Sequence, residues 1–331
     1  MSLLVADIGG TQARFRLIEA GDSGWHARHT SDSSSRQFGS LGEAVAHYLA
    51  GLTRIERADI RAAWLAVAGP VHGRQARFSN LPWRADADAL CAELRLPAVH
   101  LVNDLEALAH GVASLPEEKL IPIRKGFGDG GCQMVISSGT GLGVAAWRLQ
   151  GDHIEVFPSE GGHCDLAPVT PTHCELLRYL HGEYGHVSYE RVLSGPGLAT
   201  LYRFVVRQQD RDDSWALAPS DASPEAVTRL AGEHNDPGAL AAIRLYAELL
   251  GAFAGNAALQ SLATGGVYFA GGVATRLHPY LIGEPLAGTF ADKGRMQSLL
   301  EAIPLKAVTG GEPGLAGITR LAIREHATGA G

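Results

Sequence analysis

Three glycine-rich turns, each at the end of an apolar run, are the residues whose types and spacing first suggest chemistry. They read ADIGGT at 6–11, SSGTGLG at 137–143 and FAGGVA at 269–274. Glycine allows the backbone N–H groups of a turn to approach a ligand closely, and several such turns can enclose a polyanion. The sequence therefore predicts a phosphate site built from backbone amides and hydroxyls, with charge supplied by a metal ion.

Asp7, in the first of these turns, is the acidic residue that most needs an explanation. It lies at the end of the apolar run Leu3 to Ile8, where a carboxylate is unfavourable unless a cation meets it. Gly9 and Gly10 have a structural explanation of their own, because a tight hairpin turn favours glycines at positions with positive φ. The alternation of apolar residues from Ala13 to Leu17 fits the returning strand of such a hairpin.

Asp104 stands between a second apolar run, residues 98–102, and the helical pattern LEALAHGV at 105–112. Aspartate is a favoured N-cap, and the local sequence taken alone favours capping over catalysis. A carboxylate at such a strand end can also act as a general base, and the two roles are compatible.

Glu160 and His163 lie three residues apart across two glycines, a spacing that fits either a polar loop or half of a metal site. The dipeptides at 163–164 and 173–174 are both His-Cys and could hold zinc, although their spacing matches no usual zinc finger. Glu190 has the simplest structural interpretation, because a glutamate in the first turn of a helix benefits from the helix dipole.

Strands that alternate with helices must position these residues. Apolar runs followed by helical periodicity occur at 62–71, 98–112, 132–149 and 266–277. This alternation predicts an α/β protein with mostly internal strands. Two polar segments, 30–40 and 207–226, interrupt the pattern and are predicted to be exposed loops.

Composition and motifs exclude several classes of protein. The length of 331 residues suggests about two domains, and a net charge of -7 argues against a general nucleic-acid or membrane-surface role. The chain has four lysines and no G-x-x-x-x-G-K-[ST], which excludes a P-loop NTPase. No G-x-G-x-x-G leads into a helix, so a dinucleotide site is not expected.

The N-terminus and the cysteines indicate a cytoplasmic protein. The sequence MSLLVADIGG lacks a basic segment and meets Asp7 before an apolar signal core could form. The four cysteines form no C-x-x-C pair, which fits free thiols in a reducing compartment. No apolar stretch is expected to be long enough for a membrane span.

Seven motifs stand in order along the chain: DIGGT at 7–11, VNDLEA at 102–107, SGTGLG at 138–143, SEGGHCDLAP at 159–168, GHVSYERVLSGPGL at 185–198, FAGGVATR at 269–276 and EPGLAG at 312–317. Together they resemble the motifs of the bacterial glucokinases outside the ROK group. The ROK zinc motif C-x-C-G-x-x-G-C-x-E is absent. One departure is Glu312, because the family commonly has asparagine at this position, which leaves the adenine contacts there open.

The resemblance implies the actin-like ATPase (ribonuclease H-like) fold, an α/β fold with two α/β domains and an interdomain nucleotide and sugar cleft. In that family the C-terminal helix closes the small domain. The implied domains are therefore residues 1–113 plus 312–331 for the small one and 114–311 for the large one.

The resemblance also implies a role for each candidate residue. Asp104 would be the general base that accepts the proton of the sugar 6-hydroxyl, and Asp7 would face Mg²⁺, through water. The implied sugar ligands are Asn103, Asp104, Glu160, His163 and Glu190. The implied nucleotide-binding residues are Ala6, Asp7, Ile8, Gly9, Gly10, Thr11, Ser138, Gly139, Thr140, Gly141, Gly271 and Gly272.

The function implied is transfer of the γ-phosphoryl group of ATP to the 6-hydroxyl of D-glucose, by a cytoplasmic homodimer with no nucleic-acid or membrane partner. The alternatives are another hexose kinase of the same fold, or a nucleotide-driven switch ATPase. A sugar-sensing repressor is disfavoured, because the first strand leaves no room for an N-terminal helix-turn-helix.

Overall fold

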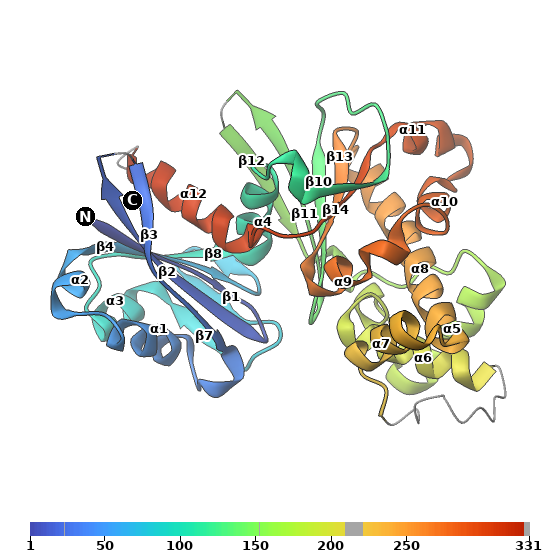
Figure 1. The fold of residues 1–331 in the computed structure, drawn as a ribbon, viewed down its shortest axis with the longest axis horizontal. Coiled ribbons are helices and arrows are strands. Elements are labelled where there is room, and N and C mark those ends of the chain that lie inside the picture. Colours follow the sequence, from blue (N-terminus) through green and yellow to red (C-terminus); the bar gives the residue numbers. More distant parts are fainter. Residues whose placement is uncertain (23, 152, 209–220, 328–331) are drawn as a thin grey trace. The chain divides into compact units, whose positions relative to one another are not determined.

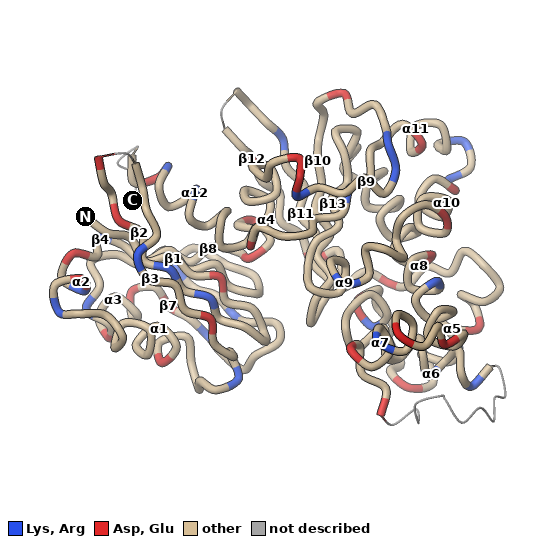
Figure 2. The backbone as a smooth tube through the Cα atoms, in the orientation of Figure 1, with Lys and Arg blue, Asp and Glu red and all other residues tan. Residues whose placement is uncertain are grey.

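The chain divides into two compact units in a computed structural model that describes residues 1–22, 24–151, 153–208 and 221–327 (Figure 1). One unit comprises residues 1–115 with 311–331, and the other comprises residues 116–310. These limits lie within two residues of those that the resemblance implied. Acidic and basic residues are interspersed along the elements of each unit (Figure 2).

The first unit is built on a five-stranded sheet with the order β3-β2-β1-β4-β8. Its strands are β1 (Ser2–Ile8), β2 (Gln12–Gly21), β3 (Gly24–Ser34), β4 (Ile60–Val67) and β8 (Val99–Asn103). The predicted hairpin is confirmed, because β1 and β2 pair antiparallel with Asp7 opposite Arg14. By contrast, β1, β4 and β8 run parallel, so their carboxyl ends share one edge. A small second sheet contains β5 (Val71–His72), β6 (Gln75–Arg77) and β7 (Arg84–Asp86).

Helices cover both faces of this sheet. Alternate residues of β1 point to opposite sides, and the residues on both sides are apolar and must be covered. Leu4, Ala6 and Ile8 belong to one apolar cluster, whereas Leu3 and Val5 belong to another that includes the C-terminal helix. The helices are α1 (Leu41–Ala50), α2 (Arg54–Asp59), α3 (Ala87–Leu94), α4 (Asp104–Val112) and α12 (Pro313–Ala327).

The C-terminal helix α12 packs against α4 at a crossing that only glycine permits (Figure 1). A Cβ at Gly317 would lie 1.7 Å from the carbonyl oxygen of Ala107, and one at Gly111 would lie 1.8 Å from that of Pro313. This close backbone approach explains why the end of the chain belongs to the first unit.

The sheet of the second unit repeats the strand order of the first. Its order is β12-β11-β10-β13-β14-β9, in which β10 is antiparallel to β11 and parallel to β13, as β1 is to β2 and β4. The strands are β9 (Leu120–Arg124), β10 (Gln133–Ser138), β11 (Leu142–Gln150), β12 (His153–Ser159), β13 (Gly266–Ala270) and β14 (Leu305–Val308). The glycine turns after β1 and after β10 therefore occupy equivalent places in the two units.

The helices of the second unit gather around the long helix α8. They are α5 (Pro171–Tyr184), α6 (Gly195–Gln208), α7 (Pro224–His234), α8 (Pro237–Ser261), α9 (Gly271–Leu281), α10 (Leu286–Ala291) and α11 (Gln297–Ala302). Contrary to the sequence expectation, α8 is long and apolar enough to cross a membrane, but 78% of its apolar window is buried inside the protein. Its apolar character is therefore that of a core helix.

Both predicted loops were partly wrong. Of the polar segment 30–40, residues 30–34 belong to β3, an edge strand whose residues need not be apolar because much of it faces solvent. Of the second segment, residues 209–220 lie outside the described residues, whereas α6 extends to Gln208 and α7 begins at Pro224.

Candidate active site

The turn between β1 and β2 is held by a residue that sequence reasoning missed. Ser35 is fully buried; its Oγ donates to the carbonyl of Gly9 at 2.7 Å, and its N–H donates to that of Thr11 at 2.9 Å. The hairpin explanation for the glycines is wrong, because neither Gly9 nor Gly10 has positive φ. Close packing explains Gly10 instead, since a Cβ there would lie 2.9 Å from the Cβ of Asn80.

The carboxylate of Asp7 lies against the first turn of α12. A Cβ at Gly314 would stand 2.4 Å from its Oδ2, so this glycine makes room for the carboxylate. Burial raises the pKa of Asp7 to about 6, although Arg14 lowers it and Glu312 raises it further. The Nε of Arg14 is 3.3 Å from Asp32, so its charge is shared. Asp7 is thus a half-buried carboxylate whose negative charge is only partly compensated, an arrangement that suits a bound cation.

Glu312, the departure from the family pattern, adopts a φ of +43°, in the left-handed region that asparagine tolerates better than glutamate. Its carboxylate is 3.1 Å from the guanidinium of Arg16 and 3.9 Å from Nε of Arg14. These ion pairs account for a glutamate at a backbone position where asparagine is more usual.

Asp104 and the turn after β1 lie at the same edge of the sheet. Ile8 is in register with Val67, and Val67 with Asn103, so the ends of β1 and β8 are two strand spacings apart, about 10 Å. Asp104 is the first residue of α4, and its Oδ1 accepts the N–H of Leu105 at 3.0 Å. The carboxylate therefore stands at a helix N-terminus on the edge that carries the first glycine turn.

The N-cap of α4 is Asn103, so the prediction that Asp104 caps the helix was wrong by one residue. The Oδ1 of Asn103 accepts the N–H groups of Leu105 and Glu106 at 3.0 and 3.3 Å. Its Nδ2 donates to the carbonyl of Gly69 at 3.0 Å. Capping fixes the amide and leaves its second N–H for a ligand.

In the second unit, the turn after β10 adjoins the N-terminus of α9. Ser137 pairs with Ala270, which brings the two strand ends together. Gly271 has a φ of +90°, and a Cβ there would lie 2.3 Å from the carbonyl oxygen of Ser138, whereas a Cβ at Gly272 would meet nothing within 4 Å. Among the described residues no side chain caps α9, so the N–H groups of its first turn suit an anionic group.

The side chain of Ser138 does not face a ligand. The residue is 1% exposed, and its Oγ donates to the carbonyl of Leu193 at 2.8 Å and accepts the hydroxyl of Tyr246 at 2.6 Å. Any contribution of Ser138 to nucleotide binding must therefore come from its backbone, which the sequence alone could not reveal.

The imidazole of His163 lies between the carboxylates of Glu160 and Glu190. Its Nε2 is 3.8 Å from Oε2 of Glu160, and its Nδ1 is 3.9 Å from Oε1 of Glu190. The second oxygen of Glu190 accepts the N–H of Leu142 at 2.9 Å, immediately after the glycine turn 138–141. A Cβ at Gly162 would lie 1.9 Å from the carbonyl of Leu142, so both loops pack on one residue. These groups can accept hydrogen bonds from the hydroxyl groups of a polyol and donate hydrogen bonds to them.

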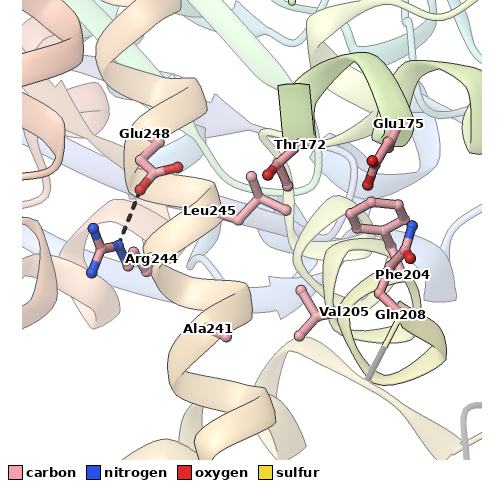
Figure 3. A pocket seen from close by; sticks show the side chains of 9 residues that line it. All are labelled: Thr172, Glu175, Phe204, Val205, Gln208, Ala241, Arg244, Leu245 and Glu248. Carbon is pink, nitrogen blue, oxygen red and sulfur yellow. Dashed lines mark hydrogen bonds and ion pairs between the residues drawn. The ribbon is translucent and has the colours of Figure 1, made fainter. Parts of the chain in front are cut away.

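The second His-Cys dipeptide lies elsewhere in this unit. His173 is fully buried, its Nδ1 accepts the N–H of Val169 at 3.4 Å, and its Nε2 lies 3.8 Å from Glu248. Glu248 borders a pocket of about 330 Å³ between α5, α6 and α8, and it forms an ion pair there with Arg244 (Figure 3). None of the predicted site residues lines this pocket.

Comparison with known proteins identifies the family of the chain. The family model described as Glucokinase matches residues 4–325. A glucokinase of Nitrobacter hamburgensis is 37% identical over 322 residues, 96% of this chain and 96% of the relative. A glucokinase of Nostoc punctiforme is 34% identical over 345 residues, 97% of this chain and 99% of the relative.

The solved structure of a glucokinase from an Antarctic psychrotroph matches with a TM-score of 0.78 and 30% identity, over 98% of this chain and 99% of that one. The match confirms the predicted α/β fold of the actin-like ATPase type. Because the family match spans nearly its whole length, the chain belongs to the glucokinase family.

Proposed function

We propose that the protein transfers the γ-phosphoryl group of ATP to the 6-hydroxyl of D-glucose, giving glucose 6-phosphate and ADP. The observation that carries the proposal is the convergence of Glu160, His163 and Glu190 beside the glycine turn 138–141. Carboxylates suit a polyol because their oxygens accept hydroxyl protons, and an epimer with a misplaced hydroxyl leaves one of these acceptors unpaired. Family membership supports the same reaction.

Asp104 is the proposed general base, which accepts the proton of the 6-hydroxyl as that oxygen attacks the γ-phosphorus in line. Asn103, whose amide keeps one N–H beyond its capping bonds, would donate to a ring hydroxyl. The turns 6–11 and 138–141, with Gly271 and Gly272, would bind the phosphates and the adenosine through backbone N–H groups.

Mg²⁺ is proposed to accompany ATP, held by Asp7 through water. The residue fits this role, because the charge of its half-buried carboxylate is only partly compensated by Arg14. When bound, the ion supplies neutralisation of the charge on the transferred phosphate.

The proposal is tested by measuring ADP release from Mg-ATP with glucose, mannose, fructose or no sugar. We expect release to depend on glucose, with mannose and fructose supporting less. Faster release with mannose or fructose would favour the other hexose kinase, and release that ignores sugar would indicate a nucleotide-driven switch.

Glu160→Gln should raise KM for glucose by about 10- to 100-fold, since a charged acceptor for a sugar hydroxyl is lost. The side chain of Glu160 is 58% exposed, so the free energy of unfolding should not change. Glu155→Gln, on β12, removes the same charge away from the cluster and serves as the control. Equal KM values for glucose in both variants would contradict the assigned role.

Gly271 and Gly272 offer a paired test of the nucleotide site. Gly271→Ala should lower the free energy of unfolding by about 3 kcal/mol, because φ is positive and the added Cβ meets Ser138. Gly272→Ala has room for its methyl group, so stability should be retained while KM for ATP rises several-fold. Denaturant unfolding and steady-state kinetics separate these effects, and an unchanged KM for ATP in Gly272→Ala would remove Gly272 from the site.

Three further features complete the proposal. We infer that the two units are separate folding domains, that the enzyme is a homodimer and that it acts in the cytoplasm, where ATP is available. Analytical ultracentrifugation and fractionation of the native host cell test the last two inferences directly.

A further inference from the structure

A buried tyrosine on the core helix α8 is bonded to the glycine turn of the second unit. Tyr246 is 0% exposed, and its hydroxyl donates to Oγ of Ser138 at 2.6 Å. Ser138 in turn donates to the carbonyl of Leu193 at 2.8 Å. These two bonds form a directed chain from α8, through the last residue of β10, to the segment that precedes α6.

We propose that Tyr246 is a positioning residue for the phosphates of the nucleotide, acting through Ser138 on the backbone of the turn 138–141. The inference rests on the proposed function, in which the N–H groups of this turn bind those phosphates. Backbone donors stabilise a developing charge best when they are fixed before the substrate arrives. The hydroxyl of Tyr246 supplies such fixation from the core side of the turn.

The segment 190–195 is bonded both to the same turn, at Gly139, and to Leu142, the residue that follows the turn. The N–H of Gly195 donates to the carbonyl of Gly139 at 2.8 Å. The N–H of Leu142 donates to Glu190 at 2.9 Å. The bonds of Gly139 and Leu142 orient the two ends of the turn, whereas the chain from Tyr246 fixes Ser138, at the point where the strand becomes the turn.

The hydroxyl of Tyr246 acts as a donor throughout the physiological range of pH, because burial raises its pKa far above the usual value. Since Ser138 donates its own proton to Leu193, the tyrosine hydroxyl is the partner for a lone pair of the serine oxygen. Loss of this donor leaves a buried acceptor unsatisfied and the serine free to change rotamer.

The test compares Tyr246→Phe with Tyr268→Phe. The hydroxyl of Tyr268 donates to Gln133 at 3.0 Å, at the opposite end of β10, so the control also loses a tyrosine hydrogen bond to the same strand. Calorimetry measures the affinity of each variant for Mg²⁺ with a non-hydrolysable ATP analogue, and separately for glucose. Tyr246→Phe should weaken nucleotide binding about 10-fold and change glucose binding less than about 2-fold, while the control should change neither by more than about 2-fold.

Ser138→Ala breaks the same chain, so it should reproduce the loss of nucleotide affinity, and the double variant should lose little more than either single one. Unchanged nucleotide affinity in Tyr246→Phe, an equal loss in Tyr268→Phe, or an equal loss of glucose affinity would overturn the proposal. If Tyr246→Phe does not fold, Ser138→Ala alone decides by the same criteria.

These binding measurements separate the inference from the proposed function. A wild-type protein that binds the nucleotide without phosphorylating glucose would overturn the proposed function, and the affinity of Tyr246→Phe would still decide the role of the tyrosine. A wild-type protein that does not bind the nucleotide would overturn both.

Discussion

Asp104→Asn is expected to lower kcat by about 10² to 10⁴, the range for a lost general base. Asparagine has nearly the same shape and can still accept the N–H of Leu105, as Oδ1 of Asp104 does at 3.0 Å. It cannot accept the proton of the sugar hydroxyl. KM for glucose should change much less than kcat, because proton transfer occurs at the transition state. Steady-state kinetics and calorimetric binding of glucose measure the two effects separately.

Glu106→Gln is the matched control for this substitution. Glu106 lies in the same first turn of α4, and burial raises its pKa. Its replacement removes one negative charge from the helix N-terminus without touching the proposed chemistry. We expect kcat within about 2-fold of wild type. Near-normal turnover in Asp104→Asn, or an equal loss in both variants, would falsify the assignment of the base.

Asp7→Asn is expected to lower kcat/KM for Mg-ATP by about 10², because an oriented anion near the metal is lost. Asparagine fits beside Gly314, whose missing side chain already makes room for a group of this size. The loss should not be recovered at saturating glucose. Kinetics with varied Mg²⁺ check this point, and an unchanged dependence on Mg²⁺ would contradict the role of Asp7.

The same variant should be more stable than the wild type in the absence of nucleotide, and the gain should depend on pH. The folded pKa of Asp7 is about 6, above the usual 3.8, so the folded state binds the proton more tightly. Stability from this group is therefore present below about pH 4 and is lost as pH rises through about 6. The loss above that pH is on the order of 3 kcal/mol, which asparagine would avoid.

Urea unfolding measures this gain at about pH 4 and about pH 7.5. A gain that is small at the lower pH and reaches up to about 3 kcal/mol at the higher one is the expected result. An equal gain at both pH values would show that ionisation of Asp7 does not lower the stability of the folded protein. Together with the kinetic loss, the expected result would show that Asp7 increases activity and lowers the free energy of unfolding.

The sequence predicted the elements that carry the site because their signals are local. The alternation around Ala13 to Leu17 predicted the returning strand β2, and the apolar run before Asn103 predicted β8. The motif resemblance grouped Glu160, His163 and Glu190, and the structure brings the three side chains together, whereas their role in sugar binding stays a prediction. Matching motifs can thus predict which residues lie close together in the fold before the contacts between their side chains are known.

The residues that sequence reasoning missed act over long separations. Ser35 holds the first turn, Tyr246 bonds to the last residue of β10, and Gly314 makes room for Asp7, which lies near the other end of the chain. No local pattern distinguishes a serine in a polar segment, a tyrosine in a core helix or a glycine in a helix from their ordinary counterparts. The repeated strand order of the two sheets was missed for a related reason, because it is a similarity of topology and not of local sequence.

The N-cap of α4 was misplaced by a single residue because asparagine and aspartate are almost equally good caps. The neighbours Asn103 and Asp104 could exchange roles without any change in local pattern, and the end of β8 at Asn103 decides between them. This difference matters for function, because the capping bonds are made by the side-chain amide of Asn103 and not by the carboxylate of the proposed base, Asp104.

The most direct test of the central claim is identification of the product by ³¹P NMR after incubation with Mg-ATP and glucose, with 6-deoxyglucose in a parallel sample. The account predicts glucose 6-phosphate in an amount equal to the ADP formed, and no sugar phosphate from 6-deoxyglucose. Phosphate released as the inorganic ion in both samples, or phosphorylation at another hydroxyl, would contradict it.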